Sequence, residues 1–395
     1  MFEDDRLTVI CWAKTTDSAI TFYLESFAFH LSKHTPVWVL DLHNEAAISK
    51  AFSLLASGRI GRWISVANVG FLSKYLSENG TKPTAEILEK CKVRVISVGY
   101  DWDLEMIPEL PYGALYTQFT QSLLGPARAF MKDGIAVGRL AHAANPAVAL
   151  DWAERDIDVL FAGNLYRTPD EIRLSWRDQD PKFRESLENA LEAWRTVTNK
   201  YDETPFQAVL AALTPIYGDV VPAMAFTKAL YSLDELIRAE ARFDLVKQLK
   251  KSKVTIVGAG WDRFDTPNLN LLGKRTQTEA VELMRRSRMV LNLSAPYFAS
   301  HERVFFGMAM QVAVGTYGRN FLENAGDPPS DEPIIYLQPE TLDEVIADRI
   351  SKNSQLRDLT ITAHSRFLAN HTWEARAKIL YDYIDLTTKS LPIPE

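Results

Sequence analysis

The chain has 395 residues, of which 47% are hydrophobic and 24% are charged, an ordinary balance for folded globular domains. At about 150 residues per domain, this length predicts two or three domains. The 44 basic and 51 acidic residues leave a net charge of −7, which argues against nucleic-acid binding through a broad basic surface.

The first 150 residues alternate short β-branched runs with longer amphipathic stretches. The predicted strands are 7–13, 36–42, 62–69 and 93–100. The predicted helices are 18–34, 45–55 and a segment between the last two strands. Strand–helix–strand repeats of this length indicate parallel pairing with right-handed crossovers. We therefore expect an α/β fold whose N-terminal domain, residues 1–150, is Rossmann-like.

A second series of strands and helices begins near residue 153. The predicted strands are 157–166, 253–261, 288–295, 311–317 and 333–338, and a terminal helix is predicted at 355–388. These elements predict a second Rossmann-like domain at 151–375, with a helical insertion at about 181–250. The last residues, 376–395, are expected to form a helix that packs back on the N-terminal domain.

The chain carries no sign of a disulfide framework or of a targeting segment. Its two cysteines, Cys11 and Cys91, are too few for such a framework or for a cysteine-built metal site. The acidic start, MFEDDRLTVICWAK, lacks the basic and apolar regions of a secretory signal. No run reaches about 18 apolar residues. We expect a cytoplasmic protein without a transmembrane segment.

Two segments of the C-terminal half could hold a ligand. The predicted strand KVTIVGAGWD ends in Gly258-Ala259-Gly260, where glycines permit a tight turn at the carboxyl end of the sheet. The second segment is LNLSAPYFASHERVFF, in which Ser300 is the expected helix N-cap, with Glu302 and Arg303 in the first turn. A helix start with an arginine can hold a diphosphate, although a plain cap with a solvated ion pair fits equally well.

Taken together, the segments of this half resemble the C-terminal domain of group 1 glycosyltransferases, especially the branch of spore-maturation CgeB-like proteins. In that branch a strand like LNLS precedes an ERVF-type helix, a small-residue turn and an apolar strand. IDVLFAGNLY, VTIVGAGWD, LLGKRTQTEAVELMRRSRMVLNL and SRFLANHTWEARAKILYDYI also follow the order of the family. The resemblance covers roughly residues 155–385.

The resemblance implies a GT-B fold, in which two Rossmann-like domains face a cleft and the C-terminal one holds most of a nucleotide-sugar donor. The residues that it assigns to the donor are Gly163, Asn164, Gly258, Gly260, Trp261, Lys274, His301, Glu302 and Arg303. The two glycine turns would approach the diphosphate, sugar and nucleotide. Lys274 would lie near the base, and the segment 301–303 would lie at the phosphates and ribose.

The chain departs from the family in its ERVF-type helix. Relatives commonly have a ribose-binding carboxylate where this chain has Phe306, and a glycine where it has Gln311. Glu302 lies four residues before Phe306, hence on the same helix face, and could accept the ribose hydroxyls instead. Met310 replaces the second glutamate of many retaining relatives, so the stereochemistry stays open.

The candidate acceptor residues are Thr16, His43, Asp101 and Asp103. Asp17, in the loop after the first strand, is the candidate catalytic base, because a carboxylate there needs only a modest rise in pKa. Thr16 or Asp17 could equally be the cap of the first helix. Asp101-Trp102-Asp103 has the Asp-x-Asp form of a metal site in GT-A transferases. His142, near the expected linker, could face the donor or have a structural role.

The sequence therefore predicts a metal-independent glycosyltransferase, hexosyltransferase-like, without a cofactor and with a UDP- or GDP-linked sugar as donor. Its acceptor carries a hydroxyl and could be a polysaccharide, a protein or a small metabolite. One alternative is a non-catalytic protein that binds nucleotide sugars or glycans, which the replacement of the carboxylate by Phe306 suggests. The other is a GT-A-like enzyme with a metal at Asp101 and Asp103.

Overall fold

The structure is a computed structural model and describes residues 6–12, 19–66, 84–99, 104–118, 124–197, 205–264, 266–295, 297, 301–317 and 333–390. The chain folds into two compact units. Unit 1 comprises Met1–Ala141 and Trp373–Glu395, and unit 2 comprises His142–Thr372. The domain boundaries expected after residues 150 and 375 stay predictions. The compact units change over slightly earlier, after Ala141 and after Thr372.

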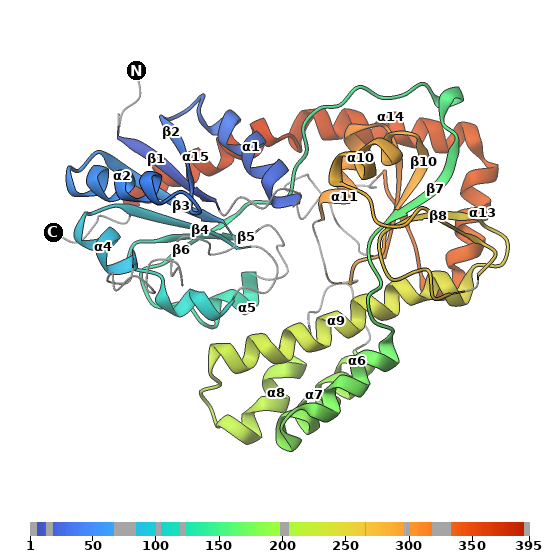
Figure 1. Cartoon of the computed structure of the whole chain (residues 1–395), viewed down its shortest axis with the longest axis horizontal. Coiled ribbons are helices and arrows are strands. Elements are labelled where there is room, and N and C mark those ends of the chain that lie inside the picture. The colour runs from blue at the N-terminus through green and yellow to red at the C-terminus, as the bar shows by residue number, and fades with distance from the viewer. Residues whose placement is uncertain are drawn as a thin grey trace. The chain divides into compact units, whose positions relative to one another are not determined.

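Unit 1 is built on a six-stranded sheet with the strand order β2-β1-β3-β4-β5-β6 (Figure 1). Its strands are β1 (Leu7–Trp12), β2 (Val37–Asp41), β3 (Ile60–Val66), β4 (Arg94–Gly99), β5 (Leu115–Gln118) and β6 (Ala136–Arg139). The pairs are parallel, and side chains such as Ile10, Ile64 and Ile96 are fully buried, as in sheets that helices cover on both faces. Helices of this unit include α1 (Ala19–Leu31), α2 (Glu45–Ala56), α4 (Thr84–Lys90) and α5 (Leu124–Arg128).

Unit 2 contains a second six-stranded parallel sheet, in the order β12-β11-β10-β7-β8-β9. Its strands are β7 (Ile157–Ala162), β8 (Val254–Val257), β9 (Leu269–Leu271), β10 (Ser287–Asn292), β11 (Ala313–Thr316) and β12 (Ile335–Tyr336). The helices between and after these strands include α10 (Gln277–Arg285), α11 (Glu302–Ala309), α13 (Leu342–Ser351) and α14 (Asn353–Asn370). The prediction of two Rossmann-like domains is confirmed.

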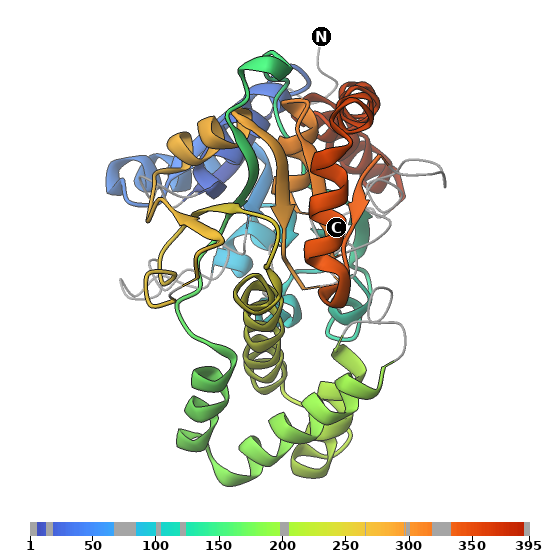
Figure 2. The ribbon, with the colours of Figure 1, turned by 90° about the vertical axis from the view of Figure 1, so that its right-hand side faces the viewer.

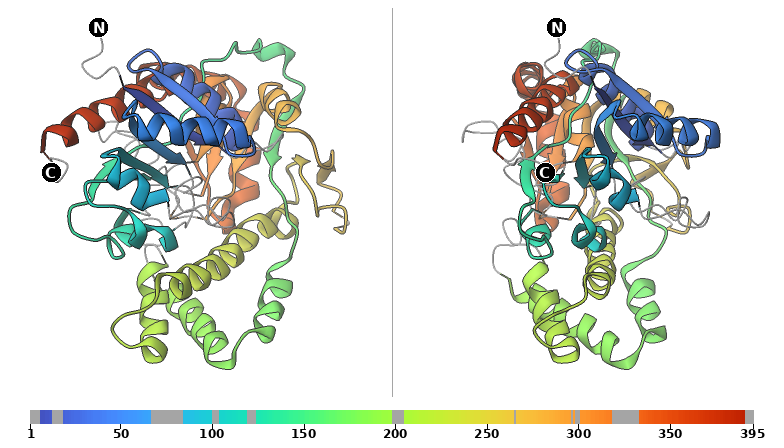
Figure 3. Two further views of the ribbon diagram at one scale, coloured as in Figure 1. Left: turned by 60° about the vertical axis from the view of Figure 1, so that its left-hand side comes forward. Right: turned by 90° about the vertical axis from the view of Figure 1, so that its left-hand side faces the viewer.

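The segment predicted to be a helical insertion is helical where the structure describes it. Its helices are α7 (Pro181–Thr196), α8 (Phe206–Tyr217) and α9 (Ala223–Gln248), and α6 (Pro169–Ser175) precedes them. A capping box of Thr168 and Glu171 starts α6, and the Asp180 side chain caps α7. Helix α9 lies between the second sheet and helices α6, α7 and α8 (Figures 1, 2 and 3).

The single terminal helix predicted at 355–388 is wrong, because the chain breaks between α14 and α15 (Trp373–Ser390). At the break, the carbonyl of His371 accepts a hydrogen bond from the amide of Ala144, and Thr372 forms a parallel bridge with Ala144. These contacts use backbone groups that a continuous helix would need for itself. Helix α15 then contacts α1 within unit 1, where Lys33 and Glu374 form an ion pair at 2.6 Å.

The Asp343 carboxylate fastens the end of α9 to the start of α13. It accepts hydrogen bonds from the amides of Lys250, Lys251 and Ser252 at 2.9, 2.8 and 2.9 Å, and it is 3% exposed. Burial alone would raise the pKa of Asp343, but these amides lower it overall. The ionised form is therefore the one that the fold stabilises.

We expect Asp343→Asn to lower the free energy of unfolding by about 2–3 kcal/mol at pH 7, since the amide nitrogen that replaces one carboxylate oxygen cannot accept a hydrogen bond and the remaining oxygen carries no full charge. Because the folded pKa lies below the unfolded value of about 3.9, the carboxylate stabilises the fold above that pH. This stability is lost as the pH falls through the folded pKa. Urea unfolding at pH 7 and pH 3 measures both effects. A gap between variant and native protein that does not shrink at low pH would contradict this account.

Three further features concern the cysteines, membrane-spanning helices and metal-binding groups. Cys11, which is buried, and Cys91 are both free thiols. None of the helices in the described ranges is both long and apolar enough to cross a membrane. Those same ranges contain no group of three or more His, Cys, Asp or Glu side chains that could hold a metal ion.

Candidate functional site

The strand order of unit 2 reverses between β7 and β10. From β7 the chain proceeds through β8 to β9 on one side, and β10, β11 and β12 extend the sheet on the other side. In open parallel sheets, ligands bind beyond the carboxyl ends of the strands at such a reversal. The residues that follow β7, β8 and β10 therefore define the candidate site.

The loops that follow β7 and β8 are locked together by hydrogen bonds. The amide of Gly163 donates to the carbonyl of Val257 at 2.8 Å, and the amide of Leu165 donates to Ala259 at 2.9 Å. The Asn164 side chain accepts from the amide of Ala259 at 2.8 Å. Gly163 and Asn164, predicted to approach the donor, thus first serve to join the two loops.

Gly258 and Gly260 are required by this close approach of the two loops. A β-carbon at Gly258, whose φ is +147°, would lie 2.1 Å from the carbonyl oxygen of Gly163. One at Gly260, whose φ is +84°, would lie 2.3 Å from the carbonyl oxygen of Leu165. The neighbouring loop fills the space that a side chain would occupy at either position. Glycine is therefore required at both for structural reasons, independently of any ligand.

The buried side chain of Trp261 also contacts the loop that follows β7. Its side chain is 1% exposed, its Nε1 donates to the carbonyl of Gly163 at 2.7 Å, and its ring lies edge-on to Phe161, 5.8 Å between centroids. A ring buried in this way stiffens the loop. Lys274, by contrast, is exposed and follows Gly273, whose carbonyl accepts from the amide of Gly258.

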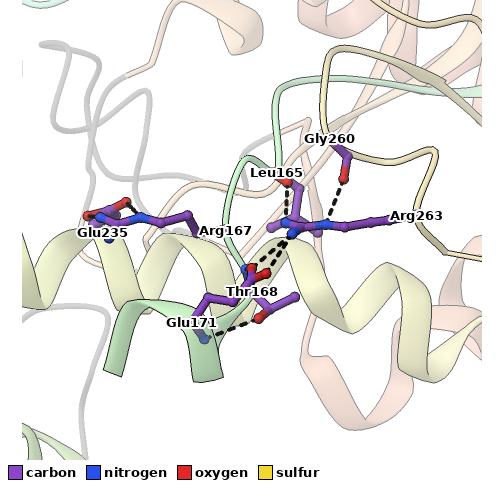
Figure 4. A network of polar contacts seen from close by, with 7 residues as sticks. All are labelled: Leu165, Arg167, Thr168, Glu171, Glu235, Gly260 and Arg263. Atoms are coloured by element: carbon purple, nitrogen blue, oxygen red, sulfur yellow. Dashed lines mark hydrogen bonds and ion pairs between the residues drawn. The ribbon is translucent and has the colours of Figure 1, made fainter. Parts of the chain in front are cut away.

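Two arginines bind the loops to the neighbouring helices (Figure 4). Arg263 donates to the carbonyls of Gly260 and Leu165, and its Nη1 lies 3.0 and 2.8 Å from the two carboxylate oxygens of Glu171 on α6. Arg167 forms a two-point ion pair with Glu235 on α9. Because guanidinium forks bind carboxylates with fixed geometry, these pairs set the position of both loops.

Helix α11 begins at Glu302, and its N-cap is His301 rather than the predicted Ser300, which lies outside the described residues. Nδ1 of His301 lies 3.3 Å from the amide of Arg303 and 3.0 Å from Oε2 of Glu302. A protonated Nδ1 donates to the carboxylate, and an unprotonated one accepts from the amide. The His142 ring stacks on His301 with 6.3 Å between centroids.

The charges around Glu302 keep it ionised. Burial would raise the pKa of this carboxyl, but the charges of His301 and Arg303 lower it well below its usual range. Burial lowers the pKa of His301 despite the opposing charge of Glu302. One oxygen of Glu302 is engaged by His301, so the carboxylate is only partly available as an acceptor for a ligand.

Arg303 stands at the reversal point of the sheet. Its Nη1 donates to Oδ1 of Asn292, the last residue of β10, at 3.2 Å, and its guanidinium lies 5.6 Å from the ring centre of Phe161 in β7. Asn292 is fully buried and donates in turn to Ser294 and Thr316. This network holds the cation at the carboxyl ends of the two strands.

Helix α9 crosses the carboxyl ends of the strands and adds charges that the sequence analysis missed. Its Arg242 donates to the carbonyl of Asn164 at 2.8 Å, and its buried Nε has no hydrogen-bond partner in the described part of the chain. Arg238 pairs with the buried Asp234 at 2.6 Å, and Asp234 accepts from the hydroxyl of Tyr297. In the sequence these charged residues are four positions apart, a spacing that places them on one face of a long helix.

The cations of α9 and α11 act on one another. Burial, together with the charges of Arg303 and Arg238, lowers the pKa of Arg242 to about 9. Arg242 is thus a cation at neutral pH that would gain from a nearby anion. On the same helix, burial raises the pKa of Asp244 to about 6, and Oδ2 of Asp244 lies 3.3 Å from the hydroxyl of Tyr317, just after β11.

Comparison with known proteins bears on the family and on the fold of the chain. Residues 238–382 match the model of a family described as glycosyl transferase-like. No curated protein sequence matches the chain. A solved glycosyltransferase from Rickettsia africae ESF-5 is similar at 8% identity, with a TM-score of 0.54, over 98% of this chain and 99% of that one.

Two further structures agree. Sucrose-phosphate synthase from Thermosynechococcus elongatus is 7% identical, with a TM-score of 0.56, over 98% of this chain and 100% of that one. HepE of Anabaena, solved with UDP, is 8% identical, with a TM-score of 0.54, over 96% of this chain and 100% of that one. The chain has the GT-B fold.

The residues predicted for the acceptor and for the catalytic base all belong to the N-terminal half of the chain. Thr16, Asp17, Asp101 and Asp103 lie outside the described residues. His43 is exposed, and its amide donates to the side chain of Asp41 at the end of β2 in unit 1. Since the fold is GT-B, the alternative of a GT-A-like enzyme loses its structural basis.

The departures from the family pattern lie in and after α11. Phe306 is 5% exposed and Met310 is 1% exposed, so neither offers a polar group to a ligand. Gln311 has φ = +54°, in the left-handed region that favours glycine. This backbone conformation explains why a glycine is expected at this position. Gln311 adopts the same conformation at a cost of about 1–2 kcal/mol.

We expect Gln311→Gly to raise the free energy of unfolding by about 0.5–1 kcal/mol, since the relieved strain exceeds the added chain entropy of glycine. Lys92→Gly in unit 1, where φ is +53°, should act in the same direction. Met310→Gly should destabilise, because Met310 has negative φ and a buried side chain. Urea denaturation of the three variants measures this. A destabilised Gln311→Gly variant would contradict the explanation.

Proposed function

We propose that the protein is a glycosyltransferase that moves a sugar from a nucleotide diphosphate, preferably UDP, to an acceptor hydroxyl. The observation that carries this proposal is the position of Arg303, a cation held by Asn292 where the second sheet reverses its strand order. The family match over residues 238–382 includes this arginine and those of α9. HepE of Anabaena, which shares the fold, has been solved with UDP and with UDP-glucose, which favours uridine.

In the proposed reaction, arginines stabilise the diphosphate as it leaves. Arg303 and Arg242 contribute cations from α11 and α9. Asn292 at the end of β10 holds Arg303, and the carbonyl of Asn164, in the interlocked loops after β7 and β8, holds Arg242 before the donor arrives. Charges fixed in advance stabilise a developing anion more than water does, because they need not reorient. Such a cation pair could replace a divalent metal, so we propose that the transfer is metal-independent and needs no cofactor.

The fate of the acceptor proton depends on the stereochemistry. For an inverting transfer, Asp17 is our proposed general base, and Thr16, His43, Asp101 and Asp103 stay the proposed acceptor contacts. For a retaining transfer, the leaving phosphate can take the proton, and no side-chain base is needed. Hexosyl transfer, membership of the CgeB-like branch and a cytoplasmic location also stay proposals. Nucleic acid is not an expected partner.

A second candidate function is binding of a nucleotide sugar without turnover. It is favoured by Phe306, which stands where relatives have a carboxylate, and by the engagement of Glu302 with His301. Under this alternative, ribose recognition is weak. The protein would then hold the diphosphate without orienting the sugar for attack.

Calorimetry with UDP and GDP, followed by a donor-hydrolysis assay with UDP-glucose, tests these functions. The transferase proposal expects saturable UDP binding and slow hydrolysis that survives EDTA. Binding of UDP without turnover across a broad donor panel would favour the binding protein. Absence of binding to either nucleotide would overturn both, and loss of turnover in EDTA would overturn metal independence.

A further inference from the structure

Residues of α6, of α7 and of the turn between them line a groove. In Figure 2 these two helices lie on the side of α9 away from the second sheet. It encloses about 670 Å³, within the range of small-molecule sites, and is open to solvent. We call it the α6–α7 groove and define it by its lining residues, which are Asp170, Glu171, Arg173, Leu174, Arg177, Arg184 and Glu188. Of these residues only Glu171 is connected to the donor site proposed above, through its ion pair with Arg263.

The charges of the groove do not cancel. Arg173 is paired with Glu188 at 2.9 Å, and Glu171 is paired with Arg263. The guanidinium groups of Arg177 and Arg184 have no hydrogen bond or ion pair to any residue that the structure describes. Only the carboxylate of Asp170 is left to oppose them. The three arginines and three carboxylates of the lining balance one another, and the pairing of Glu171 with Arg263, which lies outside the lining, leaves the groove with one net positive charge.

The frame beneath these arginines is rigid. Trp176, Phe183 and Leu187, which flank them in the chain, are 3%, 7% and 0% exposed. The Asp180 side chain caps α7 by accepting from the amides of Lys182 and Phe183. Since α6 and α7 are each anchored, little of the groove needs to be ordered when a ligand binds.

We infer that the α6–α7 groove binds an anionic saccharide, one that carries a phosphate or a carboxylate. Guanidinium groups are the side chains best suited to both anions, and the groove is larger than a lone phosphate requires. Leu174, 54% exposed, offers an aliphatic surface for a sugar ring. The lining contains no aromatic side chain, so a nucleotide base has nothing to stack on there.

The groove is connected to the donor loops. Glu171, in its wall, holds Arg263, which donates to the carbonyls of Gly260 and Leu165 (Figure 4). An anion seated in the groove would compete with Glu171 for the positive charge of Arg263. It would thereby affect the contacts that Arg263 makes with the loops after β7 and β8. The binding inference itself does not depend on the proposed transferase activity, because affinity is measured directly.

The test is calorimetry on the full chain with glucose 6-phosphate and glucuronate as probes, and with glucose and inorganic phosphate as comparisons. We expect saturable binding of at least one anionic sugar, about tenfold or more tighter than that of glucose or phosphate. Arg177→Glu/Arg184→Glu should weaken this binding at least about tenfold and leave UDP affinity unchanged. The matched control is Arg349→Glu/Arg357→Glu, the same charge change on exposed positions of α13 and α14, and it should bind as the native protein does.

Three outcomes would overturn the inference. They are absence of binding of both anionic sugars, equal binding of phosphate and glucose 6-phosphate, and affinity for the sugar that the groove variant retains. If UDP binds while the anionic sugars do not, the groove inference fails and the proposed function stands. If the sugars bind through the groove while UDP does not, the groove inference stands and the proposed function fails.

Discussion

Gly258→Ala is expected to lower the free energy of unfolding by about 3 kcal/mol and to weaken UDP binding at least about tenfold. The added β-carbon would lie 2.1 Å from the oxygen and 2.6 Å from the carbon of the Gly163 carbonyl. Both are backbone atoms, so they can move only if the loops after β7 and β8 separate. That separation would break the hydrogen bond from the Ala259 amide to Asn164 and displace the carbonyl that Arg242 binds.

The matched control is Gly273→Ala, in the segment whose carbonyl accepts from the amide of Gly258. Gly273 also has positive φ, +69°, but a β-carbon there would meet no atom within 4 Å. Alanine at this position should cost only the backbone strain, about 1 kcal/mol, and leave UDP binding intact. Urea unfolding and UDP calorimetry compare the two variants. Equal effects would show that strain alone, and not the contact between the loops, explains Gly258.

Arg303→Met should weaken UDP binding about 100-fold and lower donor turnover by at least as much. A charge-assisted hydrogen bond contributes about 1.5–3 kcal/mol, and 1.4 kcal/mol corresponds to a factor of ten. Methionine keeps most of the volume of the side chain but removes the cation. It also leaves Oδ1 of the buried Asn292 without the donor at 3.2 Å, at an expected cost in stability of about 1–3 kcal/mol.

Two further variants separate charge from structure at this position. Arg303→Lys keeps the charge without the fork, so it should recover part of the UDP affinity. Arg285→Met removes a half-buried arginine that pairs with Glu282 at 2.7 Å, and it should change neither binding nor turnover. UDP calorimetry and donor hydrolysis, with a melting curve for each variant, measure these effects. Native UDP affinity in a folded Arg303→Met protein would remove the basis of the proposed donor site.

Local pattern was sufficient for much of the fold. Long apolar runs, such as those of β1, β4 and β10, could be recognised because strands buried on both faces have few polar residues. The strands that were missed are short, namely β5, β6 and β9, with sequences LYTQ, AVGR and LNL. Runs of this length carry too little periodicity, and only pairing with a neighbour makes them strands.

Part of the candidate site was also evident from residue types and spacing. Glu302 and Arg303 were predicted at a helix start beyond a strand, and the structure has them there. The cap is His301 and not the predicted Ser300, because the imidazole Nδ1 can accept from the amide of Arg303 although serine is the commoner cap. Asp234, Arg238 and Arg242 were missed because α9 was treated as a helical insertion, with no indication of which edge of the sheet it crosses.

The amino-acid sequence by itself determined the alternation of strands and helices, and with it the two parallel sheets, because hydrophobic period and chain handedness act over short distances. Only the tertiary structure decided what the glycines after β8 do and which cations meet at Arg303. A β-carbon at Gly258 is excluded by the carbonyl of Gly163, nearly a hundred residues away in the chain. Likewise, Asn292 and Phe161 position Arg303 only because β10 and β7 are neighbours in the sheet. Such contacts depend on strand order, which no local pattern of residues records.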